Sequence, residues 1–173
     1  MDVLTSNATL QWVPGHRDLL PRLLAAVRPG GCLAFQVPGN FGEPFHTALA
    51  DVMDEPRWHE RLSGLTVERP FSEEPSTYLS ALVASGCTAD VWETTYLQVL
   101  EGPDAVVSWM KGTGLCPVLG ALDDAEQEEF VADYRARVAP AYPQRDFGTV
   151  LPYRRIFAVA QRHSARSTRI GTR

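Results

Sequence analysis

The chain has 173 residues, of which 45% are hydrophobic and 21% are charged, and its formal net charge is −5. These values suit one folded domain with a sizeable core and exclude global disorder. The acidic balance gives no support to a nucleic-acid partner, and no apolar run approaches the roughly 18 residues that a membrane span needs.

The first part of the chain has the pattern of a β-α-β unit. Residues 2–7 predict a buried strand, residues 16–27 an amphipathic helix, and residues 32–37 a second strand after the break PGG. Such units normally lie inside a parallel sheet with strands on both sides. Nothing precedes the first strand here, so we expect it to be an exposed edge. We predict self-association of the chain through residues 2–7.

The later elements alternate in the same way. Helices are predicted at 44–52 and 56–62, from 75 to just before Gly86, after Pro103, and from an acidic cap at Asp123 to about 142. Strands are predicted at 88–100 and 150–161. We therefore expect an α/β fold with helical insertions, forming one domain over residues 1–162. Residues 163–173 are rich in arginine, serine and threonine and predict a basic, flexible tail.

The cysteines and histidines carry no metal pattern. Cys32, Cys87 and Cys116 are odd in number and widely spaced, and the four histidines lack the spacing of metal ligands. This favours reduced, mostly buried thiols in a cytoplasmic protein, with no metal.

Four strings of the chain carry a resemblance to a known family. They are SNATLQWVP at 6–14, PGGCLAFQ at 29–36, WMKGTGLCP at 109–117 and RIFAVA at 155–160. The first two resemble the fourth- and fifth-strand regions of class I S-adenosylmethionine-dependent methyltransferases, which are Rossmann-like. The last two, together with PGNF at 38–41, WETTY at 92–96 and AYP at 141–143, are similar to trans-aconitate methyltransferases, and the likeness covers nearly the whole chain except the tail.

The resemblance implies a particular sheet. The family has seven strands in the order 3-2-1-4-5-7-6, with strand 7 antiparallel. On that template residues 2–7 are strand 4, 32–37 strand 5, 89–100 strand 6 and 150–161 strand 7. Strands 1–3 and the glycine-rich cofactor loop have no counterpart. We therefore expect the C-terminal portion of a methyltransferase, truncated and inactive alone.

The resemblance also implies a cofactor site where strand 4 ends. Ser6, Asn7 and Ala8 would lie beside the methionine end of S-adenosylmethionine. From residue chemistry alone, a turn that simply ends a strand is the better explanation, and the family likeness reverses that preference. Gln11 and Trp12 follow on the same loop and would border the substrate, although packing explains a Trp there about equally well.

A polycarboxylate substrate needs cationic side chains that grip its carboxylates. Lys111 and Arg155 are assigned to this role, with His16 and His46 as further candidates in loops. From residue chemistry alone, the simpler explanation is that these cationic side chains are solvent-exposed surface charges. Cys116 stands where the family has an arginine, and a neutral thiol does not grip a carboxylate as an arginine does. The substrate is therefore either trans-aconitate or a related carboxylic acid.

We expect no catalytic acid, base or metal, because an anionic carboxylate oxygen accepts a methyl group without them. The predicted function is therefore an O-methyltransferase acting on a small carboxylic acid. The alternative is a non-catalytic module that binds an acidic metabolite or completes a partner.

Overall fold

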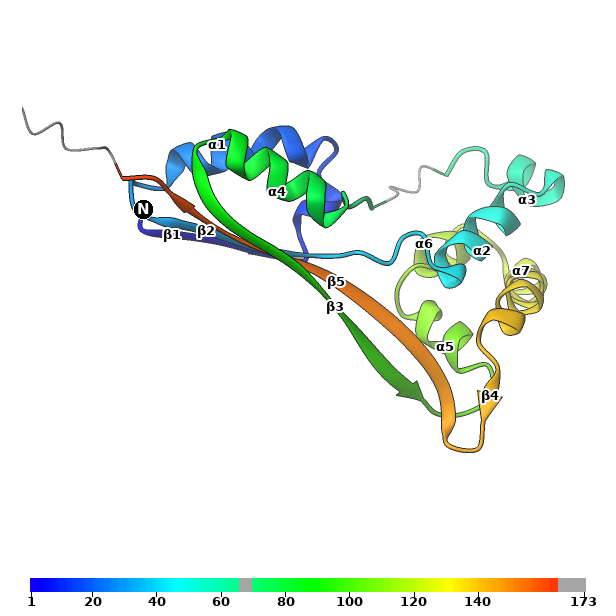
Figure 1. The fold of residues 1–173 in the computed structure, drawn as a ribbon. Helices are drawn as coiled ribbons and strands as arrows, with labels where there is room; N and C mark the ends of the chain where they lie inside the picture. Colours follow the sequence, from blue (N-terminus) through cyan, green and yellow to red (C-terminus); the bar gives the residue numbers. More distant parts are fainter. Residues whose placement is uncertain (66–69, 165–173) are drawn as a thin grey trace, which may run out of the picture. The chain divides into compact units, whose positions relative to one another are not determined.

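A computed structural model describes residues 1–65 and 70–164 of the chain. Its contacts divide these residues into two compact units (Figure 1). The first unit contains residues 1–39, 70–94 and those from 155 onward, and the second contains residues 40–69 and 95–154. That residues 1–162 form one domain stays a prediction. The predicted tail lies outside the described residues except for His163 and Ser164.

The sheet has the strand order β1-β2-β5-β3, formed by β1 (Val3–Asn7), β2 (Cys32–Pro38), β5 (Gly148–Arg162) and β3 (Cys87–Leu100). β1 and β2 are parallel, whereas β5 runs antiparallel to β2. This is the predicted order 4-5-7-6 with strand 7 antiparallel, so the expected sheet is confirmed.

One face of the sheet in the first unit is covered by α1 (His16–Ala26) and α4 (Pro75–Ala84), which Figure 1 shows side by side on it. Alternate residues of β2 point at these helices, so Leu33, Phe35 and Val37 join their leucines in one apolar cluster. Burial of this cluster is the main force that holds the unit together.

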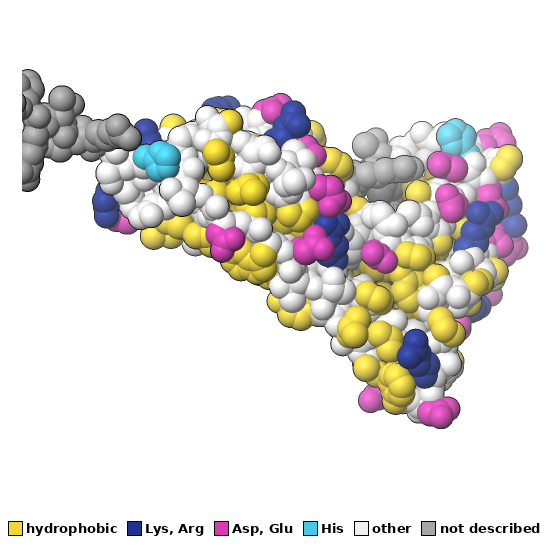
Figure 2. Space-filling view, viewed as in Figure 1, with side chains coloured by type: hydrophobic (Ala, Val, Ile, Leu, Met, Phe, Trp, Pro, Cys, Tyr) yellow, Lys and Arg dark blue, Asp and Glu magenta, His cyan; other side chains and the backbone are white. Residues whose placement is uncertain are grey.

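Among the described residues, no helix of the same unit covers the opposite face, although neighbouring side chains bury part of it. Val3, Trp92 and Val159 lie on it at 57%, 42% and 39% exposure, and Figure 2 shows hydrophobic side chains on the side turned away from α1 and α4. The expectation that β1 is a buried strand is therefore wrong. Its residues alternate between exposed and half-buried, because only one of its faces meets a helix.

The second unit is mainly helical. It contains α2 (Pro44–Met53), α3 (Pro56–Arg61), α5 (Ala105–Lys111), α6 (Cys116–Leu119), α7 (Asp124–Val138), the 3-10 helix η2 (Ala139–Ala141) and the short strand β4 (Gln144–Arg145). Its core gathers large side chains from α2, α3, α5 and α7. The core residues predicted for α7, Phe130, Val131 and Tyr134, are all buried. Two hydrogen bonds anchor this core: Tyr134 Oη donates to the carbonyl of Phe45 at 2.9 Å, and Trp58 Nε1 donates to Asp133 Oδ2 at 2.8 Å.

The acidic start of α7 forms the predicted cap. The Asp123 carboxylate accepts from the backbone N–H of Glu126 at 2.9 Å, and the Glu126 carboxylate accepts from the N–H of Asp123 at 3.0 Å. This reciprocal pairing satisfies two N–H groups that an uncapped helix leaves open. No helix among the described residues is long and apolar enough to cross a membrane.

Candidate functional site

Three polar side chains meet at one end of the sheet in the first unit. Asn7 on β1 lies directly opposite Gln36 on β2, and Arg155 on β5 lies opposite Pro38. Because side chains alternate along a strand, all three project on the face away from α1 and α4. The carboxyl ends of parallel strands are where open α/β sheets bind their ligands, so this is the candidate site.

Arg155 and Gln36 are directly bonded. Nη1 of Arg155 donates to Oε1 of Gln36 at 3.0 Å. A guanidinium only donates hydrogen bonds, so the amide must turn its oxygen toward Arg155 and its nitrogen away. Gln36 is 6% exposed, and its Nε2 has no hydrogen-bond partner within residues 1–65 and 70–164. The bond therefore leaves a buried donor without an acceptor. No sequence motif marks Gln36 as a site residue.

The three residues assigned to the cofactor do not all face the same way. Asn7 is exposed on the uncovered face, whereas Ser6, one position earlier, alternates to the helix-covered face. Ala8 adopts a left-handed backbone with φ of 50°, an uncommon conformation for a residue with a side chain. Its N–H donates to the carbonyl of Gln36 at 2.9 Å. The loop thus turns sharply just past the strand end.

Gln11 and Trp12 lie in the 3-10 helix η1 (Leu10–Trp12) that follows this turn. Gln11 is 6% exposed, and its Nε2 donates to the carbonyl of Ala8 at 2.7 Å. Its own carbonyl accepts from the N–H of Phe71 at 2.9 Å. Gln11 therefore shapes the loop, while its Oε1 has no partner in the part of the chain that the structure describes. Trp12 is 52% exposed, with its ring open to a ligand.

Lys111, the other assigned cation, ends α5 in the second unit, so the described contacts do not join it to Arg155. Its carbonyl accepts from the Sγ of Cys116 at 2.9 Å. Cys116 is exposed, so the expectation of a buried thiol is wrong for it. The reason is its position at the start of the short surface helix α6. Cys87, by contrast, is buried, and burial raises the pKa of its thiol.

The two histidines considered as clamps are not in loops, and neither is a cation at neutral pH. His16 begins α1 and is 1% exposed, and burial lowers its pKa. His46 lies in α2 between the rings of Phe41 and Phe45. Burial lowers the pKa of His46 to about 4. Both histidines therefore pack in a neutral form, and both are dropped as carboxylate ligands.

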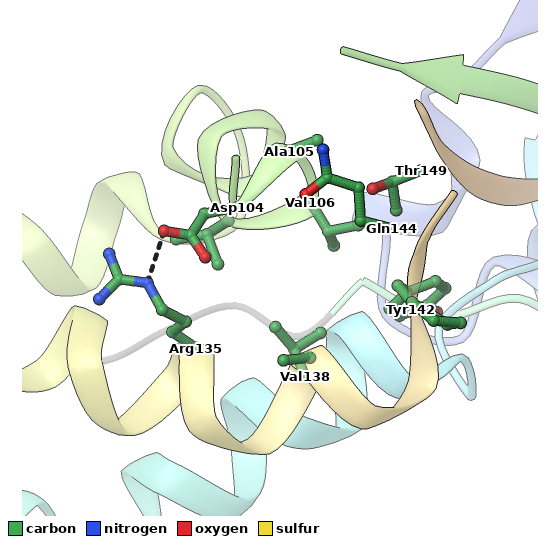
Figure 3. A pocket seen from close by; sticks show the side chains of 11 residues that line it. Asp104, Ala105, Val106, Arg135, Val138, Tyr142, Gln144 and Thr149 are labelled. Carbon is green, nitrogen blue, oxygen red and sulfur yellow. Dashed lines mark ion pairs between the residues drawn. The ribbon is translucent and has the colours of Figure 1, made fainter. Parts of the chain in front are cut away.

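A pocket of about 200 Å³ lies within the second unit, between α5, the end of α7 and the β4 region (Figure 3). Asp104 and Arg135 point toward each other at its edge, with 2.8 Å between Asp104 Oδ2 and Arg135 Nε. Gln144 and Thr149 add polar atoms, and Val138 adds an apolar wall. The charges of the ion pair cancel, so the pocket does not favour a polyanion. No sequence motif predicts this pocket.

The glycine pairs of the chain have packing roles. A Cβ on Gly31 would meet the carbonyl oxygen of Asp2 at 2.5 Å, and one on Gly114 would meet the Cε of Met110 at 2.7 Å. Gly31 also precedes β2, at the opposite end of the strands from the candidate site. Neither glycine pair therefore cradles a cofactor.

Strand order and the antiparallel β5 together define this fold as the C-terminal part of a class I methyltransferase sheet. No family model matches the chain. Among solved structures it is similar to the YcgJ protein of Bacillus subtilis, with a TM-score of 0.53 and 9% identity, over 95% of this chain and 65% of that one. That likeness concerns the fold alone.

Sequence comparison is more specific. The chain is 52% identical over 163 residues to trans-aconitate 2-methyltransferase of Streptomyces avermitilis, covering 94% of this chain and 61% of that protein. The same enzyme of Streptomyces coelicolor is 53% identical, over 93% of this chain and 54% of the relative. The trans-aconitate 2-methyltransferase of Methylobacterium nodulans is 46% identical, over 93% of this chain and 63% of the relative.

The chain is therefore homologous to the C-terminal part of the trans-aconitate 2-methyltransferases, as the resemblance predicted. It spans 54–63% of the length of these three relatives.

Proposed function

We propose that the chain is the substrate-recognising, C-terminal part of an S-adenosylmethionine-dependent O-methyltransferase that acts on a small polycarboxylate. The observation that carries this is the placement of Asn7, Gln36 and Arg155 on one face at the carboxyl ends of the strands. The name of the relatives supplies the reaction and the kind of substrate.

The chemistry asks little of the protein beyond placement. S-adenosylmethionine, when bound, supplies an electrophilic methyl group. A carboxylate oxygen forms the new C–O bond as the S–C bond breaks, and no proton moves. We therefore assign no residue as catalytic. Arg155 would bind and orient the anionic substrate, with Gln11 and Trp12 as further proposed contacts, and exclusion of water would favour the attack.

The residues of this chain fit one end of the cofactor. The exposed amide of Asn7 and the tight turn at Ala8 offer polar contacts beside the strand end. No glycine-rich loop of the strand–loop–helix kind accompanies them. A few contacts must first overcome several kcal/mol of association entropy. We therefore propose that the chain by itself neither binds the cofactor at micromolar levels nor transfers methyl groups.

Calorimetric titration tests this proposal. The purified chain should give no saturable micromolar isotherm with S-adenosylmethionine. The same chain joined to the part of the Streptomyces avermitilis relative that lies ahead of the matched region should bind it. A micromolar isotherm from the chain by itself would contradict the proposed dependence on that part, and a joined protein without affinity would contradict the cofactor assignment.

A second candidate function is a non-catalytic module that binds an acidic metabolite or completes a partner. The uncovered apolar face with Val3, Trp92 and Val159 favours it, because an exposed apolar face of this kind commonly meets another protein segment. Binding of a polycarboxylate that persists in a joined protein without any methyl transfer would favour this module over the enzyme.

A further inference from the structure

We propose that Gln36 is a further recognition residue of the candidate site: it holds Arg155 in place and, together with it, binds a substrate carboxylate that does not react. This rests on the proposed polycarboxylate substrate and adds to it a residue and a role that the sequence comparison does not assign.

The first support is the local geometry. The 3.0 Å bond from Arg155 Nη1 to Gln36 Oε1 joins neighbouring strands diagonally, since Gln36 lies opposite Phe157 and Arg155 lies two residues before it. Both side chains therefore share the uncovered face. Because β2 and β5 are held in register by their backbone, the bond fixes where the guanidinium stands.

The second support is the unused donor. Arg155 takes the amide oxygen, so Nε2 of Gln36 must point elsewhere, and it has no partner among the described residues although Gln36 is 94% buried. A buried donor without an acceptor is costly, so such atoms in folded proteins commonly mark a binding role. An incoming carboxylate oxygen would supply the acceptor. The side chain of Asn7, directly opposite and exposed, is able to turn aside for it.

The third support is the apolar surface beside these donors. The rings of Phe157 and Trp92 stack with centroids 5.3 Å apart and planes 10° from parallel. Phe157 is the register neighbour of Gln36. A low-dielectric wall strengthens charge-assisted hydrogen bonds next to it, and it suits the carbon chain between two carboxylates.

Reaction chemistry decides which carboxylate binds here. An oxygen that accepts hydrogen bonds from both a guanidinium and an amide loses nucleophilicity, so the reacting carboxylate must stand elsewhere. Gln36 and Arg155 thus hold a second carboxylate of the same molecule. This predicts that di- and tricarboxylates bind, whereas a monocarboxylate of similar charge density binds far more weakly.

The test is a titration of the 173-residue chain with trans-aconitate or with acetate, in the absence of S-adenosylmethionine. NMR signals of the side-chain N–H groups report the binding. Trans-aconitate should shift the Nε–Hε signal of Arg155 and the amide signals of Gln36, and acetate should not. Gln36→Leu should weaken trans-aconitate binding at least about ten-fold, as expected for a hydrogen bond to a charged group.

Two further variants separate recognition from structure. Gln36→Glu keeps an acceptor for Arg155, so the fold and its stability should persist, but it removes the donor and adds a negative charge. It should therefore bind no better than Gln36→Leu. Gln161→Leu is the matched control, because Gln161 lies on the same face opposite Cys32, at the other end of the strands. Its affinity should match the original chain.

The proposal would be overturned by absence of trans-aconitate binding to the original chain, by wild-type affinity in folded Gln36→Glu, or by equal losses in Gln161→Leu. Since the cofactor is absent from this titration, failure of methyl transfer in a joined protein would contradict the proposed function and leave this result standing.

Discussion

The hydroxyl of Tyr78 lies 2.6 Å from Nε2 of His16 in the interior of the first unit. The same hydroxyl accepts a hydrogen bond from the backbone N–H of Glu73 at 3.0 Å, so it bonds to two groups at once, and the tautomer of His16 sets the direction of the bond between the side chains. Burial raises the pKa of Tyr78 to about 12 and lowers that of His16, so both groups are neutral at pH 7. The pair ties α1 to α4 over the covered face of the sheet.

Replacing Tyr78 by Phe should lower the free energy of unfolding by about 1–3 kcal/mol. The change removes a partner from the buried Nε2 of His16 and from the partly buried N–H of Glu73, which costs about that much. Urea denaturation measures it. Tyr96→Phe is the control, because Tyr96 is 45% exposed and its change should stay within about 0.5 kcal/mol. Equal stability of Tyr78→Phe and the original chain would show that the buried bond contributes nothing.

The half-buried His46 should make the chain less stable in acid. The pKa of His46 falls from 6.5 to about 4 on burial, so the unfolded chain binds a proton that the folded chain refuses. Stability is then full above pH 6.5 and falls as the pH drops toward 4. After allowance for its partial exposure, His46 accounts for about 2 kcal/mol of this loss.

Urea denaturation across pH 4 to 7 checks this prediction. His46→Gln removes the titration, so its stability should fall less steeply than that of the original chain. His59→Gln changes an exposed histidine of the same unit and should preserve the slope. A steep slope that survives His46→Gln would assign the loss to other groups.

Apolar periodicity was enough to predict the long elements. Alternation along β2 and helical spacing in α1 and α7 need only local residues, and the strand order followed from the family resemblance. The short helix α6, with four residues, and β4, with two, are too brief to show a period. Gln36 was overlooked because it stands inside the apolar run LAFQV. Which face of that run meets a helix depends on the tertiary structure.

The histidines were misplaced for a related reason. Gly15 precedes His16, and a glycine-proline-rich stretch precedes His46, so both positions resembled loops. The helices in fact begin at His16 and Pro44. Whether a histidine is charged then depends on burial, which local sequence does not specify.

The terminal strand of the sheet should promote self-association. Among the described residues, β1 pairs with a strand on one side only. Its first residue, Val3, is 57% exposed. Exposed strand edges pair readily with another chain. Analytical ultracentrifugation should show dimers or larger species at high concentration. Val3→Lys should reduce them, whereas Val83→Lys on the exposed side of α4 should not. A monomer at all concentrations would refute this.

Substrate preference should depend on Arg155, which matches the family's sequence, and on Cys116, which stands where the family has an arginine. In the joined protein, Arg155→Ala should raise the KM for a polycarboxylate by a factor equivalent to about 1.5–3 kcal/mol, with a smaller effect on kcat. Cys116→Arg should improve the use of trans-aconitate, because it restores a cation that grips carboxylates. Unchanged kinetics in both variants would remove Arg155 and position 116 from substrate binding.

The most direct test of the central claim is methyl transfer itself. Labelled S-adenosylmethionine and trans-aconitate are incubated with the 173-residue chain, and with the same chain joined to the part of the Streptomyces avermitilis relative ahead of the matched region. We predict no product from the chain by itself and a base-labile methyl ester from the joined protein. Failure of a folded joined protein to form the ester, or of Arg155→Ala to impair it, would contradict the account.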